Sequence, residues 1–76
     1  MYIVSISIDK RAKEIPDVQE VLTKNGGNIT TRLGIHDPDE ERKGLIIVTY
    51  IGENIEEFIE ELNSIDELIS INFMEV

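Results

Sequence analysis

The sequence predicts an α+β domain in which a four-stranded antiparallel sheet carries two helices on one face. Two observations predict this fold. Four segments alternate apolar with polar residues, as half-buried strands do, and two others repeat apolar residues at the spacing of an amphipathic helix. These segments follow one another as strand, helix, strand, strand, helix, strand. With 76 residues, the chain has the length of a single domain, residues 1–76.

The first half of the chain contains a strand and a helix. Apolar residues at even positions predict a strand over Tyr2–Ile8. A polar connection over residues 9–15 follows, and Pro16 suits the first turn of a helix, because the first N–H groups of a helix have no partner within it. We expect this helix to end near Asn25, since the pair Gly26-Gly27 is a common helix stop. Its apolar stripe consists of Val18, Val21 and Leu22.

Residues 28–76 contain three strands and a second helix. Alternation predicts strands over Asn28–His36, Leu45–Ile51 and Leu68–Val76, and the charged residues 37–44 are expected to form a hairpin loop. Asn54 is a favourable residue for the start of the second helix. The apolar stripe of that helix consists of Ile55, Phe58, Ile59 and Leu62. This order of elements is that of the ferredoxin-like βαββαβ sandwich.

The two faces of the sheet are expected to differ in what covers them. The more continuous apolar set of each strand should meet the helices. This assigns to the helix-covered face Val4, Ile6, Ile8, Ile29, Leu33, Leu45, Ile47, Ile69, Ile71 and Phe73. The other face would then expose Ile3, Ile46, Val48, Tyr50 and Met74 among Ser5, Ser7, Thr30, Arg32, Ser70 and Asn72. Because an exposed apolar patch on a small monomer marks an interaction surface, we expect those five apolar residues to form the interface of a homodimer or homotetramer.

Charge is distributed unevenly along the chain, which has 16 acidic and 7 basic residues and a formal net charge of −9. All basic residues lie in residues 1–43, whereas the charged residues of 44–76 are all acidic. Nucleic acids and anionic membranes are bound mainly through clustered Lys and Arg, so neither is expected as a direct partner. The absence of cysteine excludes disulfides within the chain, thiolate metal sites and cysteine nucleophiles. The longest aliphatic run, Leu45–Val48, is far too short to span a membrane, and a cytoplasmic location is expected.

Four residues are candidates for binding a small ligand. Lys10 and Arg11 follow the first strand, and Arg32 lies in the second, so they could bring positive charge to a small anion near the start of the first helix. Asn28, at the start of the second strand, completes the candidate set. The alternative role for the basic residues is an ion pair within the oligomer.

No residues combine into a catalytic or metal-binding motif. His36 precedes an acidic loop and could contribute to a metal site, but the spacing matches no known calcium or zinc motif and a solvated hairpin is favoured. Ser5, Ser7 and Ser70 lack a base with an orienting carboxylate. We therefore expect no enzyme activity and no cofactor. The alternative is a small hydrolase similar to acylphosphatases, for which the pair Lys10-Arg11 is the only indication, or a metal-binding protein on the same fold.

Two stretches resemble known families. The segment Pro16–Leu22 followed by Asn25–Ile29 resembles the ACT regulatory domain, whose first helix typically opens with Pro-Gly and whose second strand opens with Gly-x-Asn-Ile. More specifically, Val18–Thr23, the Asn25-Gly26 turn and the segment Arg32–Asp37 resemble the small iron-only hydrogenase system regulator family, which has an ACT-like fold.

The resemblance implies a non-enzymatic regulatory domain that associates with itself and senses a small-molecule effector at the subunit boundary. ACT domains often bind amino acids there through the glycine-bearing turn before the first helix. In this chain Asp17 stands where that glycine is typical, and its charge would repel a carboxylate. If the domain regulates transcription, it must act through another regulatory protein, since it contains no basic DNA-binding element.

Overall fold

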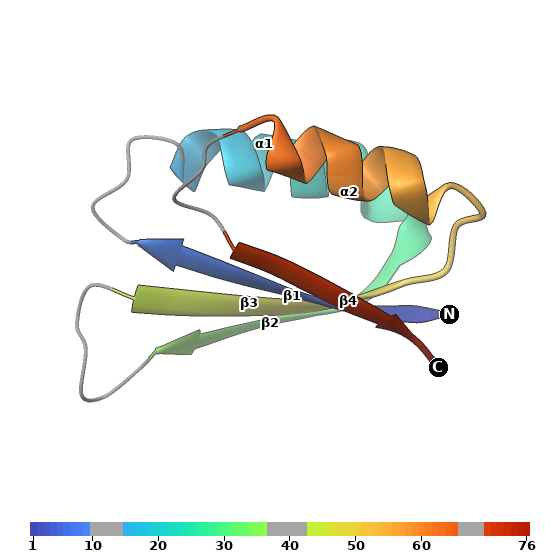
Figure 1. Ribbon diagram of the computed structural model, residues 1–76, viewed down its shortest axis with the longest axis horizontal. Helices are drawn as coiled ribbons and strands as arrows, with labels where there is room; N and C mark the ends of the chain where they lie inside the picture. The colour runs from blue at the N-terminus through green and yellow to red at the C-terminus, as the bar shows by residue number, and fades with distance from the viewer. Residues whose placement is uncertain (10–14, 37–42, 66–69) are drawn as a thin grey trace.

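The sheet has the strand order β2-β3-β1-β4, with every neighbouring pair antiparallel. In the computed structural model, which describes residues 1–9, 15–36, 43–65 and 70–76, both helices lie on one side of this sheet (Figure 1). The elements are β1 Tyr2–Asp9, α1 Ile15–Lys24, the short 3-10 helix η1 Gly26–Asn28, β2 Ile29–His36, β3 Lys43–Tyr50, α2 Ile55–Asn63 and β4 Ser70–Glu75. The predicted ferredoxin-like fold is confirmed. No helix in the described ranges is long and apolar enough to cross a membrane.

The element boundaries differ little from those expected. Helix α1 has Pro16 in its first turn and ends before the two glycines, which form η1. Helix α2 begins after Asn54, whose backbone carbonyl accepts the Phe58 N–H at 3.2 Å and whose side chain makes no capping hydrogen bond. The two chain ends lie at the same edge of the molecule (Figure 1), and the Val76 N–H donates to the Met1 carbonyl at 2.8 Å.

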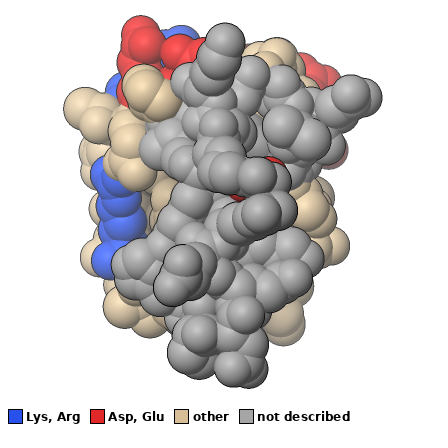
Figure 2. All heavy atoms as spheres, turned by 90° about the vertical axis from the view of Figure 1, so that its left-hand side faces the viewer, with Lys and Arg blue, Asp and Glu red and all other residues tan. Residues whose placement is uncertain are grey.

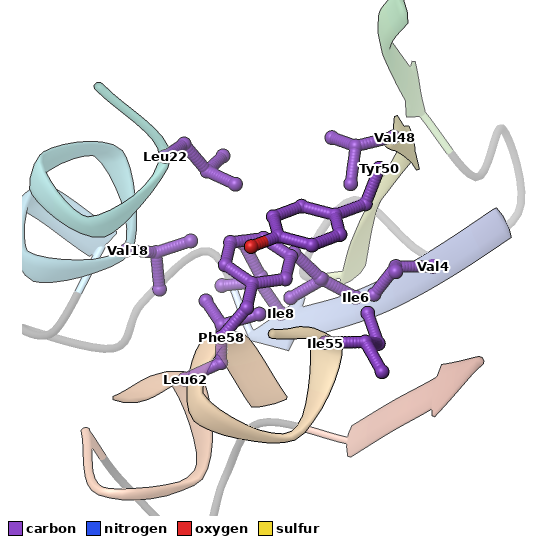
Figure 3. Close-up of a cluster of buried hydrophobic side chains, with 10 residues drawn as sticks. All are labelled: Val4, Ile6, Ile8, Val18, Leu22, Val48, Tyr50, Ile55, Phe58 and Leu62. Atoms are coloured by element: carbon purple, nitrogen blue, oxygen red, sulfur yellow. The ribbon is translucent and has the colours of Figure 1, made fainter. Parts of the chain in front are cut away.

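One cluster of buried side chains joins the sheet to both helices (Figure 3). Strands β1 and β3 contribute Val4, Ile6, Ile8, Val48 and Tyr50, and the helices contribute Val18, Leu22, Ile55, Phe58 and Leu62. The helix members are those of the predicted apolar stripes, because a stripe at helical spacing is the only part of each helix that can meet the sheet.

The predicted orientation of β3 is wrong. Val48 and Tyr50, assigned to the uncovered face, are 0% and 3% exposed beneath the helices, and Ile46 packs against the same cluster. Leu45 and Ile47 therefore lie on the uncovered face, since successive side chains of a strand alternate between faces. The run Leu45–Val48 is apolar at every position, so alternation alone could not identify its inner side. The Tyr50 ring stacks on Phe58, with ring centroids 4.7 Å apart, and this contact places the even-numbered residues of β3 on the inner side.

The predicted orientation of β2 fails for a different reason. The pairing with β3 shifts between Ile29 and Thr31, so that Ile29 is opposite Tyr50 and Thr31 is opposite Thr49. A bulge of this kind inserts one extra residue and reverses which side chains face inward. Ile29 packs against the core as expected, whereas Leu33 lies on the uncovered face and is 52% exposed. Arg32, expected on that face, is opposite Val48 and thus lies on the helix side of the sheet.

Strand β4 and its neighbour β1 match the expectation more closely. Ile71 and Phe73 are opposite Ile6 and Val4, on the helix side of the sheet, and Met74 is on the other side opposite Ile3. Phe73 contacts Tyr2 edge to face, with ring centroids 6.4 Å apart. Ile69 and Leu68, also assigned to this strand, lie outside the described residues.

Candidate interaction surface

The side of the sheet turned away from the helices, here called the open face, is built from three rows of four residues. Each row crosses the sheet from β2 to β4, because residues paired across antiparallel strands point to the same side. The first row is Thr31, Thr49, Ile3 and Met74; the second is Leu33, Ile47, Ser5 and Asn72; the third is Ile35, Leu45, Ser7 and Ser70. The pairing of β1 and β3 continues one step beyond the third row, to Asp9 and Lys43.

None of the residues in these three rows is charged, although 30% of the chain is. A random surface of this size on such a chain would include several charged side chains. Depletion of charge, together with exposed apolar residues, is typical of the centre of a protein–protein interface. The open face therefore has the composition of a surface that another protein covers.

Apolar side chains on the open face are accessible to solvent. Leu33, Ile35 and Met74 are 52%, 40% and 61% exposed. Ile3, Leu45 and Ile47 are half-buried by their neighbours in the sheet. Contiguous exposed apolar residues of this kind are uncommon on soluble monomers and mark sites of interaction.

The polar groups of the open face are neutral and partly satisfied within the sheet. The hydroxyl oxygens of Thr30 and Thr49 are 2.6 Å apart, a short hydrogen bond between neighbouring strands. The Ser5 hydroxyl donates to the backbone carbonyl of Asn72 over 3.4 Å. These groups can be covered by a neutral partner at less cost than charged groups, because a hydroxyl that keeps a partner loses little on leaving water.

The helix side of the molecule, in contrast to the open face, is rich in acidic side chains. Helix α2 exposes Glu56, Glu57 and Glu60, and Glu61 at 3.2 Å from the Lys24 ammonium forms an ion pair between the two helices. Most acidic atoms visible in Figure 2 gather at the top of that view, which is the helix side of Figure 1. Two copies of the domain would therefore repel each other through their helices and not through their open faces.

The structure brings together only part of the predicted interface. Ile3 and Met74 lie on the open face as expected, whereas Ile46, Val48 and Tyr50 do not. Three apolar residues of the open face were assigned to the other side, namely Leu33, Leu45 and Ile47, and Ile35 was assigned to neither face. One signal in the sequence could have corrected β3, since Thr49 interrupts the apolar set at odd positions and nothing interrupts the even one.

Of the four candidate ligand-binding residues, Asn28 and Arg32 lie in the part of the chain that the structure describes. Asn28 precedes Ile29, which is opposite Tyr50 and so at the end of the sheet where β1 begins. Asp9, at the other end of β1, is about 24 Å away along the strand. Lys10 and Arg11 follow Asp9 and lie outside the described residues. Arg32 is exposed in the middle of the edge strand β2. A shared site for these residues stays a prediction, and Asn28 is its least compatible member.

The candidate metal residue His36 is the last residue of β2, opposite Gly44. The acidic residues that follow it, at positions 37 and 39–41, lie outside the described residues. Within the ranges that the structure describes, no group of three or more His, Asp or Glu side chains is placed to hold a metal ion. The metal alternative stays a prediction, because it depends on the acidic loop outside the described residues.

The chain is similar in structure to several solved proteins. It matches the uncharacterized protein TM1266 from Thermotoga maritima over 96% of its own length and 91% of that chain, with a TM-score of 0.83 and 24% sequence identity. It also matches, over 99% of its length, 28% of a formyltetrahydrofolate deformylase from Pseudomonas putida KT2440, with a TM-score of 0.61 and 11% identity.

A third similar structure is an antibiotic biosynthesis monooxygenase, matched over 100% of this chain and 98% of that one, with a TM-score of 0.57 and 11% identity. At these identities the similarity shows the fold alone, because one fold hosts many functions. No protein-family model and no curated protein matches the chain.

Proposed function

We propose that this chain is a non-enzymatic, ACT-like regulatory domain that works as a homo-oligomer and binds a small effector between its subunits. The observation that carries the proposal is the set of three uncharged, partly apolar rows on the open face of the sheet. A surface of this composition is suited to a partner and has no group arranged for chemistry.

A second copy of the chain is the partner that the charge distribution favours. Each copy carries a net charge of −9, which opposes association wherever charged surfaces meet. Two open faces can approach without bringing like charges into contact. A domain of 76 residues also gains from burying more apolar surface, since one small core barely outweighs the chain entropy lost on folding.

The finer role, regulation of an iron-only hydrogenase system, rests on the motif similarity of Val18–Thr23 and Arg32–Asp37. A domain without a basic DNA-binding element would exert such control through another regulatory protein. The effector would be anionic if Arg32 contributes to its site, because a guanidinium binds carboxylate or phosphate groups well.

Two measurements on the wild-type chain test the proposal. Sedimentation equilibrium at micromolar concentration should show a species heavier than one subunit. A thermal-shift screen against amino acids, nucleotides and divalent metals should give a melting temperature that rises with the concentration of one compound, since a ligand that binds only the folded state stabilises it. A lone subunit at all concentrations would refute the assembly, and no shift with any compound would refute the sensing role.

A pair of variants locates the effector if one is found. Arg32→Ala should abolish the thermal shift, because the exposed guanidinium on β2 supplies positive charge to the anion. Lys24→Ala removes one positive charge from α1 and should leave the shift unchanged. Equal loss of the shift in both variants would mean that Arg32 acts only through net charge.

A further inference from the structure

We propose that a second copy of this chain binds the open face through one oblique apolar strip, made of Leu33, Ile35, Leu45, Ile47, Ile3 and Met74. The serine-rich corner of the open face, made of Ser5, Ser7, Ser70 and Asn72, lies at the rim of the contact. This inference rests on the self-association proposed above and names the surface that performs it.

The shape of the strip follows from the three rows. In the second and third rows the residues of β2 and β3 are aliphatic, whereas those of β1 and β4 are Ser5, Asn72, Ser7 and Ser70. In the first row the order is reversed, since Thr31 and Thr49 occupy β2 and β3 and the apolar residues occupy β1 and β4. The apolar residues therefore run across the strands and not along them.

The strip is continuous where the rows meet. Ile47 is opposite Ser5, and Ile3 precedes Ser5 by two residues, so Ile47 and Ile3 are diagonal neighbours. Such neighbours lie about 7–8 Å apart, within reach of branched aliphatic side chains. Ile47 thus connects the apolar residues of β2 and β3 with those of β1 and β4, and it lies near the centre of the strip.

The size of the open face suits a copy of the same chain. The whole face of the sheet, with four strands about 4.8 Å apart and up to eight residues long, covers about 19 by 27 Å. Two whole faces, including the end at Asp9 and Lys43, would bury about 1,000 Å² together, near the lower limit for a specific interface. An apolar centre with a polar rim is the usual arrangement of such contacts. Because the same strip is presented by both copies, the contact is self-complementary and closes as a dimer.

Charge explains why the strip faces another copy and not the acidic helices of a neighbour. Glu56, Glu57 and Glu60 are exposed on α2, and burying their carboxylates against aliphatic side chains would leave charges without partners. Only a face that is itself uncharged can cover the strip without this cost. Within the described residues, the open face of a second copy meets that requirement.

Single charged substitutions test the strip. Leu33→Asp and Met74→Asp place a carboxylate on the part of the strip that lies on each edge strand, at side chains that are more than half exposed in one subunit, so folding should be unaffected. Asn72→Asp and Ser70→Asp are matched controls that add the same charge to the serine-rich corner. Sedimentation equilibrium should show a dissociation constant raised about tenfold or more by either strip variant and changed by less than about threefold by either control.

The outcomes separate this inference from the proposed function. A wild-type chain that sediments as one subunit refutes the self-association itself. If the wild type associates but the corner variants dissociate it and the strip variants do not, self-association stands and the strip assignment is overturned. Equal dissociation by all four variants also overturns the strip, because it would show that the whole face contributes. Circular dichroism of each variant confirms that it is folded.

Discussion

The rings of Tyr50 and Phe58 stack nearly parallel, with centroids 4.7 Å apart and an angle of 10° between their planes. This contact joins the last residue of β3 to the middle of α2, and both side chains are buried (Figure 3). It orients β3, because a tyrosine that points toward α2 places Val48 and Ile46 on the same side. The β3 residues of the open face, Leu45 and Ile47, follow from this orientation.

Phe58→Ala should reduce the free energy of unfolding by about 3–5 kcal/mol, because it removes a buried ring and leaves a cavity against Tyr50. Urea unfolding followed by circular dichroism measures the change. Phe58→Leu, which keeps more of the volume, should cost about 1.5 kcal/mol or less and serves if the alanine variant does not fold. Glu57→Ala, exposed on the same helix, is the control. Equal loss in Glu57→Ala and Phe58→Ala would contradict the central role of the stacked pair.

Gly52 has no room for a side chain. A Cβ atom there would lie 2.7 Å from the Tyr50 hydroxyl oxygen and 2.9 Å from Cγ of Asn28. Because Tyr50 is held by its stacking on Phe58, the ring cannot swing away, and Gly52→Ala should destabilise the fold by about 1–3 kcal/mol. Thermal and urea unfolding test this expectation.

The control for that substitution is Gly34→Ala, since nothing lies within 4 Å of a Cβ atom at Gly34. It should leave stability unchanged or raise it slightly by restricting the unfolded chain. In the Tyr50→Phe background the contact with the hydroxyl oxygen is lost, but Cζ of the ring stays 2.8 Å from the added Cβ, so the cost of Gly52→Ala should fall only in part. If Gly52→Ala costs the same with and without that oxygen, the Tyr50 hydroxyl is not what limits the site.

The fold followed from the sequence because its signals are local and repeated. In α1, α2 and β1 the apolar residues all fall on one side of the element. The pair Gly26-Gly27 marks where a helix must stop. The faces of β2 and β3 could not be derived in the same way. The four aliphatic residues Leu45–Val48 do not by themselves identify an inner side. Thr49 is a weak indication, and the contact between Tyr50 and Phe58 fixes the orientation.

The bulge in β2 had no signal in the sequence at all. Ile29, Leu33 and Ile35 are all at odd positions, so a regular strand would place them on one face. The register shift after Ile29 breaks that relation. The sequence predicts an interface because it has more apolar residues than two helices can cover. Some of the residues assigned to that interface lie in the core, and some of those assigned to the core lie on the open face.

Acyl-phosphate hydrolysis tests the enzyme alternative. We expect no turnover above the rate of the uncatalysed reaction, because the sequence offers no base and nucleophile in combination. The assay compares the wild type with Arg11→Ala, the variant that would remove the only arginine next to Lys10. Turnover in the wild type that is lost in Arg11→Ala, with no change in stability, would establish a hydrolase and overturn the non-enzymatic role.

The salt dependence of self-association distinguishes an uncharged contact from one held by ion pairs. Two copies with a net charge of −9 repel each other over the Debye length, which shrinks from about 30 Å at 0.01 M to about 3 Å at 1 M salt. The open face contributes no opposite charges in its three rows to offset that repulsion. Raising the sodium chloride concentration should therefore lower the dissociation constant of the oligomer.

Sedimentation equilibrium across this range of salt measures the effect, and Leu33→Asp provides the internal comparison. In that variant the contact itself carries two like charges, one from each copy, so its dissociation constant should fall more steeply with salt than that of the wild type. An oligomer that dissociates as salt is added would be held by attraction between opposite charges. Such a result would place the contact away from the open face, where Arg32 and the glutamates of α2 could meet.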